Sequence, residues 1–238
     1  MEPDPDRRTA LQALALAGAG IGLAAMAQTP PAASAPTASP PALRPLPFDP
    51  AKLDGLSEKM IRSHWENNYG GSVRTLAAVK KQLADALASK DTPAWLYNDL
   101  KREHLLRTGS VVFHEYYFDN LGGSGSASAG TRKTIGDAFG SFDAWETEFR
   151  RIANGLGGGS GWVVLGYNAH TRVLENYWMA DHGHGPAATL PLLVMDMYEH
   201  SYQMDFGAAT ARYIDAFFRN IQWDAVASRL EQAQRLPA

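Results

Sequence analysis

A carboxylate and an imidazole lie four residues apart near the C-terminal end of this chain, directly after an apolar run. They are Asp196 and His200, and the run 190–195 before them is typical of a buried strand. A spacing of four places two side chains on one face of a helix, and a turn that follows a strand brings them together as well. Two more histidines, His64 and His114, lie far upstream. One carboxylate and three imidazoles suit iron, manganese or zinc, and an open coordination position leaves room for a small substrate.

Four short motifs occur in order along the chain, and together they are more specific than any one of them. They read HWENNYGGSV at 64–73, HEYYFDNL at 114–121, GSGW at 159–162 and DMYEHSY at 196–202. From about Leu46 to the C-terminus the chain resembles the iron/manganese superoxide dismutase family, with Tyr198 where that family usually has tryptophan. The resemblance implies an enzyme that converts superoxide to oxygen and hydrogen peroxide.

The same resemblance implies a metal site with four protein ligands. The residues that fall on the ligand positions are His64, His114, Asp196 and His200. They would hold one iron or manganese ion per chain. The sequence does not distinguish the two metals, and zinc would be inert in this reaction because it has no redox cycle.

His182 is the candidate for a group that acts on solvent at the metal. It matches a family position whose side chain can face the metal-bound solvent, where manganese enzymes often have glutamine. Iron enzymes commonly take a glutamine from the second helix instead, at the place of Ser110 here. Because serine is too short for that role, we expect His182 to orient the solvent and to tune the metal's potential.

Two further departures from the family pattern bear on the proton path. The usual gateway tyrosine falls on Ser72, which cannot supply a phenol proton, and Tyr69 is the candidate that partly replaces it. A histidine and a tyrosine that meet across the family's dimer fall on Asn68 and Gln203, whose amides could preserve a hydrogen bond. The proton path is therefore left open, although the metal ligands are complete.

The resemblance further implies a homodimer. Glu199 would lie at the two-fold interface and reach the ligand histidine of the other subunit. Trp162 and Tyr117, together with Phe118 and Tyr198, would wall the site with rings, a role that is compatible with ordinary core packing.

Apolar spacing predicts two long helices in the first half of the folded part. One covers 56–89, with a break expected near Gly70 and Gly71, and the second covers about 100–121. A short link between them favours an antiparallel hairpin. The Gly/Ser-rich segment 122–132 is the expected boundary between two halves.

The second half mixes helices and strands. Helices are predicted at 142–155 and 207–221, and strands at 162–167, 172–179 and 190–195. The predicted fold is therefore α+β: a long N-terminal helical hairpin, then an α/β half with a small, about three-stranded antiparallel sheet. The corresponding domains are 47–125 and 126–238.

The N-terminal residues predict export. Arg7 and Arg8 precede the apolar stretch 10–25, and small residues follow at a spacing that suits a signal peptidase. Residues 1–27 are therefore predicted to be a signal peptide, with the arginine pair suggesting the twin-arginine route. A retained anchor is the alternative, although the stretch is short and weakly hydrophobic for a membrane span. Residues 28–46, rich in Pro, Ala, Ser and Thr, are expected to form an extended tether.

Composition limits the partners. The formal net charge is -3, which gives no reason to expect nucleic acid or an anionic membrane surface as a partner. Cysteine is absent, so disulfides, thiolate metal sites and cysteine nucleophiles are excluded. We expect a periplasmic protein with no stable membrane association after signal cleavage.

Two other functions compete with dismutation. One is an exported metal-binding protein of the same fold whose dismutase activity is weak or lost, which the missing gateway tyrosine supports. The other is a non-redox hydrolase with the same four ligands. It ranks last because the sequence shows no separate general base or substrate cleft.

Overall fold

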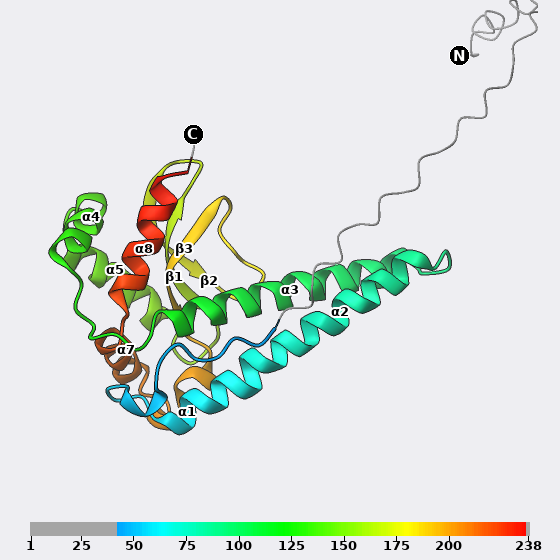
Figure 1. The fold of residues 1–238 in the computed structure, drawn as a ribbon, viewed down its shortest axis with the longest axis horizontal. Coiled ribbons are helices and arrows are strands. Elements are labelled where there is room, and N and C mark those ends of the chain that lie inside the picture. The colour runs from blue at the N-terminus through cyan, green and yellow to red at the C-terminus, as the bar shows by residue number, and fades with distance from the viewer. Residues whose placement is uncertain (1–41, 237–238) are drawn as a thin grey trace, which may run out of the picture. The chain divides into compact units, whose positions relative to one another are not determined.

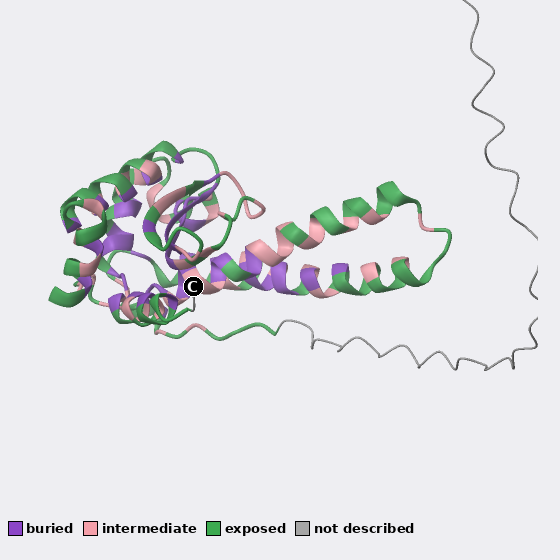
Figure 2. Cartoon of the chain, turned by 90° about the horizontal axis from the view of Figure 1, so that it is seen from above, coloured by how far each residue is buried: buried purple, intermediate pink, exposed green. Residues whose placement is uncertain are grey.

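Two long helices, α2 (Gly70–Ala88) and α3 (Ala94–Asp119), pack side by side as an antiparallel hairpin (Figure 1). The computed structural model describes residues 42–236, and all of these residues belong to one compact unit. Near the sheet the two helices carry buried residues, whereas their far ends are exposed (Figure 2). The predicted helical hairpin is confirmed.

The first helical stretch is continuous, so the break expected at Gly70 and Gly71 is wrong. Ser57 caps α1 (Glu58–Ser63), and a π-helical segment, η2 (His64–Tyr69), then leads directly into α2. The N–H of Gly70 bonds to the carbonyl of Trp65, five residues back. Backbone hydrogen bonding therefore runs through the glycines, and the irregularity falls one turn earlier, where the π-helical turn is wider than a regular one.

Three strands form an antiparallel sheet in the order β2-β1-β3. The strands are β1 (Trp162–Asn168), β2 (Val173–Met179) and β3 (Thr189–Asp196). The central strand β1 is almost wholly buried, and its first residue, Trp162, lies opposite Asp196 of β3. The predicted α+β fold with a small antiparallel sheet is confirmed.

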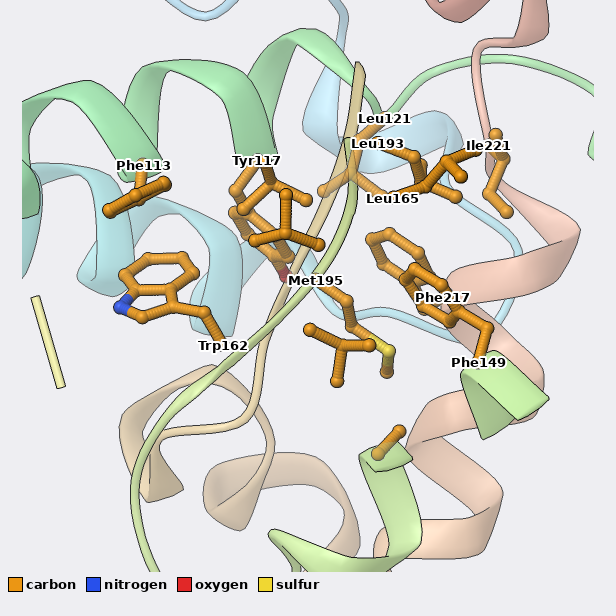
Figure 3. Packing of buried hydrophobic residues seen from close by; sticks show 14 of the residues in the cluster. Phe113, Tyr117, Leu121, Phe149, Trp162, Leu165, Leu193, Met195, Phe217 and Ile221 are labelled. Atoms are coloured by element: carbon orange, nitrogen blue, oxygen red, sulfur yellow. The ribbon is translucent and has the colours of Figure 1, made fainter. Parts of the chain in front are cut away.

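Helices cover the sheet and fill out the core. They are α4 (Ala129–Phe139), α5 (Phe142–Gly155), α7 (Thr210–Arg219) and α8 (Trp223–Gln234). Aromatic side chains from α5 and α7, including Phe149 and Phe217, meet Leu165 and Met195 of the sheet (Figure 3). The short elements are η1 (Pro50–Lys52), η3 (Glu199–Ser201) and α6 (Gln203–Phe206).

Helices α4 and α8 were not predicted from the sequence. Residues 122–132 were interpreted as a boundary, but α4 begins inside that segment because the Ser128 side chain accepts a hydrogen bond from the N–H of Thr131. The last helix, α8, was also missed. Helix α7 is shorter than the predicted range 207–221.

The helical hairpin is tied to the sheet at the end of α3. The Asn120 side chain donates to the carbonyl of Leu192 at 3.2 Å and accepts from the N–H of Val194 at 2.9 Å. This buried amide holds α3 against β3, the two elements that carry His114 and Asp196.

The division into domains 47–125 and 126–238 stays a prediction.

The predicted signal peptide, residues 1–27, and most of the tether, residues 28–41, lie outside the described residues. The end of the tether contacts the helical hairpin: the N–H of Arg44 donates to the Tyr69 hydroxyl at 3.1 Å, and the Arg44 carbonyl accepts from the Trp65 indole. Across residues 42–236, none of the helices is both long and apolar enough to span a bilayer.

Candidate metal centre

Three imidazoles converge on one carboxylate oxygen. The Nε2 atoms of His64, His114 and His200 lie 3.1, 3.7 and 3.2 Å from Oδ2 of Asp196. One potential ligand atom from each of the four residues lies within 4.8 Å of the others. The structure thus brings together the four predicted ligands, from η2, α3, the end of β3 and the turn η3. The sequence allowed Asp196 and His200 to meet either on one face of a helix or through a turn that follows a strand, and the structure has the strand followed by a turn.

Asp196 is held by its own turn. Its Oδ1 accepts a hydrogen bond from the N–H of Tyr198 at 2.8 Å, which leaves Oδ2 directed at the imidazoles. Its backbone carbonyl accepts from the hydroxyls of Tyr213 and Ser201, at 2.7 and 2.9 Å. Burial raises the pKa of the Asp196 carboxyl, but the neighbouring His200 and His64 outweigh it and hold that pKa well below its usual range.

The tautomer of His114 follows from its hydrogen bond. Its Nδ1 lies 2.7 Å from the carbonyl oxygen of Ser110, and because a carbonyl only accepts, Nδ1 carries the proton. The lone pair of Nε2 therefore faces Asp196. Burial lowers the pKa of His114 to about 3, which keeps the ring neutral and able to bind a metal.

Several buried nitrogens have no hydrogen-bond partner within residues 42–236: both ring nitrogens of His64 and Nε2 of His114. The Nε2 of His64 is near Oδ2 of Asp196 but lacks hydrogen-bond geometry. Buried polar atoms without partners are costly, and a cation between them would satisfy the nitrogens and the carboxylate together. The donor set and its burial therefore fit an iron or manganese ion.

His182 lies beside this cluster and is oriented by Trp162. The indole Nε1, which can only donate, is 3.0 Å from Nδ1 of His182. Burial lowers the pKa of His182, so the ring is neutral and its proton is on Nε2. His182 also stacks on Tyr198 with ring centroids 4.8 Å apart.

A cavity of about 250 Å³ opens onto the cluster. His114 and His200 line it together with His182, so two predicted ligands face the same space. Ser72 and Ser110 also line it, and their hydroxyl oxygens are 2.7 Å apart. The cavity thus leaves open space beside two of the four predicted ligands.

The Tyr69 side chain contacts two other segments of the chain. Its hydroxyl donates to Glu115 at 2.9 Å and accepts from the N–H of Arg44, and Tyr69 does not line the cavity of Ser72. In this structure the Tyr69 hydroxyl is thus engaged away from the cavity that Ser72 lines, and the role of Tyr69 as a partial replacement stays a prediction. Tyr69 belongs to the wider π-helical turn, across which the spacing of a regular α-helix does not apply.

The remaining predicted residues lie around the centre in different settings. Trp162 and Tyr117 are fully buried, with ring centroids 5.1 Å from His114 and His64 respectively, so they wall the cluster. Asn68 is half-buried and lines the cavity, whereas Glu199 and Gln203 are exposed in this chain. The cross-subunit roles of these three polar residues stay predictions.

Sequence reasoning missed three contributors to the site. Tyr213 and Ser201 fix the Asp196 backbone, and Arg107 lines the cavity. A signal for Arg107 was available: it precedes His114 by two helical turns, which places both on one face of α3.

Comparison with known proteins agrees with this geometry. Residues 127–229 match the model of the C-terminal domain of iron/manganese superoxide dismutases. An iron superoxide dismutase from Cupriavidus metallidurans is 48% identical over 193 residues, covering 81% of this chain and 98% of the relative. The chain belongs to the iron/manganese superoxide dismutase family.

Other members of the family carry either metal in their names. An iron superoxide dismutase from Aquifex pyrophilus is 35% identical over 78% of this chain and 89% of its own length. A manganese superoxide dismutase from Haloferax volcanii is 29% identical over 82% of this chain and 97% of its own length. The family therefore supports a metal cofactor and leaves its identity open between iron and manganese.

Proposed function

We propose that this chain is a superoxide dismutase with one iron or manganese ion bound by His64, His114, Asp196 and His200. The observation that carries the proposal is the convergence of three Nε2 atoms on Oδ2 of Asp196 in a buried cluster that faces a cavity. The names of the relatives, up to 48% identical, support the same activity.

The bound ion would supply the one-electron oxidation and reduction that, with two protons taken up from solvent, turn two superoxide anions into oxygen and hydrogen peroxide. The protein residues set the conditions for this chemistry. Asp196 contributes one negative charge, and the imidazoles bind as neutral ligands. His182, with its proton on Nε2, presents a hydrogen-bond donor to the cavity, and Trp162 keeps the ring in that tautomer.

The competing reading as a metal-binding protein with weak or lost activity is not favoured, because the relatives that cover most of the chain are named superoxide dismutases. The hydrolase reading gains no support from the cavity, since none of its lining residues carries a carboxylate and Nδ1 of His182 already accepts a hydrogen bond from Trp162.

The proposed function is tested by assaying superoxide consumption on samples loaded separately with iron, manganese and zinc, each with measured metal content. We expect turnover with iron or manganese and none with zinc. Equal, negligible rates in all three samples at full occupancy would refute the dismutase assignment and support the metal-binding alternative.

We also propose a homodimer in which Glu199 bonds to His200 of the partner subunit. Glu199 is exposed in the single chain, and no hydrogen bond to Nδ1 of His200 is formed within residues 42–236, which leaves this nitrogen available. A carboxylate there would orient a ligand histidine. Glu199→Ala is expected to weaken the dimer by about tenfold or more, because a hydrogen bond that involves a charged group contributes about 1.5–3 kcal/mol and about 1.4 kcal/mol corresponds to tenfold in a dissociation constant. Light scattering over a dilution series measures the change; a monomeric parent protein at high concentration would contradict the proposal.

Export is proposed from the sequence of residues 1–27, in which Arg7 and Arg8 precede an apolar stretch. We expect the mature protein to be periplasmic and to begin after the small residues at 25–27. Mass spectrometry of the protein recovered from a periplasmic fraction measures its N-terminus, and a full-length protein retained in the membrane fraction would favour an anchor.

A further inference from the structure

The N-terminal end of the described chain packs on the elements that carry two of the proposed ligands. Residues 42–48, here called the strap, lie against η2 and α3 (Figure 1). The N–H of Arg44 donates to the Tyr69 hydroxyl at 3.1 Å, and the Arg44 carbonyl accepts from the Trp65 indole at 2.8 Å. The Arg44 guanidinium pairs with Glu115 of α3 at 3.1 Å. The strap therefore binds both elements at once.

A fourth contact closes these three into a network, because the Tyr69 hydroxyl also donates to Oε1 of Glu115 at 2.9 Å. The members of this network are close to metal ligands. Trp65 directly follows His64 in the sequence. Glu115 directly follows His114, whose ring centroid lies 6.3 Å from that of Tyr69. A shift of η2 away from α3 would therefore separate two ligands from each other.

The network is well protected from water. Tyr69 is 1% exposed and the Glu115 side chain 17% exposed. The cavity between the strap and the helices measures about 10 Å³, near the lower limit for holding one water molecule. The strap is also stiff, because Pro45 and Pro47 fix their own φ angles and Pro45 restricts the residue before it. Little conformational entropy is therefore lost when the strap docks.

The network is separate from the cavity that faces the ligands. No residue lines both that cavity of about 250 Å³ and the small one beneath the strap. His114 and His200 line the larger cavity, whereas Tyr69 and Glu115 line the smaller one. Variants of the strap can therefore be tested without changing the lining of the larger cavity.

We propose that the strap holds η2 against α3 and thereby slows the release of the metal ion. Arg44 is its positioning residue, and it acts through Trp65, Tyr69 and Glu115. For the ion to leave, η2 must move away from α3, and the strap must first detach. The proposal rests on the ligands of the proposed function, but not on the reaction that the metal performs. It makes the end of the predicted tether a functional part of the metal centre.

The first test measures how fast iron leaves the reduced, iron-loaded protein, with the uncharged chelator 2,2′-bipyridine as the probe that captures iron(II). Tyr69→Phe keeps the ring but removes both hydrogen bonds of the hydroxyl, so it should speed release about tenfold. Arg44→Gln removes only the ion pair, in which the Arg44 side chain is 66% exposed, so it should speed release about threefold. Arg44→Lys should recover most of the parent's rate.

The matched control for Tyr69→Phe is Tyr177→Phe on β2. The Tyr177 hydroxyl likewise donates to a glutamate, Glu175, and accepts from an N–H, that of the Asn168 side chain. It lies outside the strap and the ligand cluster. Tyr177→Phe should therefore leave the rate of iron release unchanged.

Low concentrations of urea separate detachment of the strap from global unfolding. Global unfolding exposes much surface, so release through it should accelerate steeply with urea, whereas local opening exposes little surface. We expect release from the parent and from Tyr69→Phe to be nearly independent of urea below the unfolding transition. Release that accelerates steeply with urea, and that follows the free energy of unfolding in every variant, would refute the strap.

The ion pair is tested by a double-mutant cycle of Arg44→Gln and Glu115→Gln. Because both variants break the same pair, the double variant should release iron no faster than the faster single variant. Added salt should speed release from the parent but not from Arg44→Gln, since salt screens a partly exposed pair. Arg132→Gln is the control: Arg132 pairs through a terminal nitrogen with Asp143 at 3.2 Å, and its loss should change neither the rate nor the salt dependence.

The strap and the proposed function fail in different ways. If the metal-loaded parent consumes superoxide while Arg44→Gln and Tyr69→Phe both release iron at the parent's rate, the strap is refuted and the function stands. If both variants release iron faster as expected but the metal-loaded parent does not consume superoxide, the strap stands and the dismutase assignment is refuted. Equally fast release from Tyr177→Phe would assign the effect to overall stability and refute the strap.

Discussion

Asp196→Ala is expected to abolish stable metal binding. The substitution removes the one anionic ligand and leaves three neutral imidazoles around a buried space. Even residues outside the ligand set typically change metal affinity by 10–100-fold, so loss of the charged ligand should exceed this. Metal content, measured by mass spectrometry on protein purified with equal iron supplied, should fall to about a tenth of the parent value or less.

Asp196→Asn separates metal binding from folding, because it keeps the side-chain shape and can still accept the hydrogen bond from the N–H of Tyr198. A ligand that binds only the folded state raises the melting temperature, so the parent should melt higher with metal than without it. Asp196→Asn should lose this difference. The control is Asp137→Ala, which removes an exposed carboxylate paired with Lys133 and should keep the parent's metal content. Parent-like occupancy in both Asp196 variants would show that the ligand assignment is wrong.

The ligand set was predictable because each ligand is part of a contiguous motif. Asp196 and His200 are four residues apart, and the turn between them is built from local contacts: the N–H of Tyr198 on the carboxylate and the Ser201 hydroxyl on the Asp196 carbonyl. Such short-range geometry is encoded in a few neighbouring residues. The third strand was predictable for a similar reason, since residues 192–195 of the apolar run before Asp196 are all buried, on both faces of the sheet.

What escaped prediction depends on contacts between segments far apart in the chain. Tyr69 turns toward Glu115, 46 positions later, rather than toward Ser72. The spacing of residues in the sequence does not indicate which way the Tyr69 side chain points, because a π-helical turn interrupts the 3.6-residue period of the α-helix. The position of Arg107 over the cavity likewise depends on how α3 lies against α2.

Gly109 is the clearest case of such a long-range constraint. It lies inside α3, where glycine is usually unfavourable by about 1 kcal/mol relative to alanine. A Cβ atom added there would lie 1.9 Å from the carbonyl oxygen of His182 and 2.9 Å from its carbonyl carbon. The backbone of the loop that carries His182 therefore packs directly on the helix, and only glycine allows this approach.

Gly109→Ala is therefore expected to destabilise the protein although alanine is the better helix former. The clash is with backbone, which cannot rotate away, so the loop or the helix must move at a cost of about 1–3 kcal/mol. For a domain of this size, about 2 kcal/mol corresponds to a melting temperature roughly 4–8 °C lower. Displacing His182 also breaks its hydrogen bond with Trp162, so turnover should fall by more than metal content does.

The matched control is Gly155→Ala at the end of α5, where an added Cβ meets nothing within 4 Å. This substitution should leave turnover unchanged and raise stability by about 0.4–1 kcal/mol, because alanine restricts the unfolded chain. If the packing argument holds, the melting temperatures of the two metal-loaded variants shift in opposite directions, and superoxide assays show a loss of turnover only in Gly109→Ala. A Gly109→Ala protein that melts as high as Gly155→Ala and turns over like the parent would mean that the loop tolerates the methyl group, and that the position of His182 does not depend on this contact.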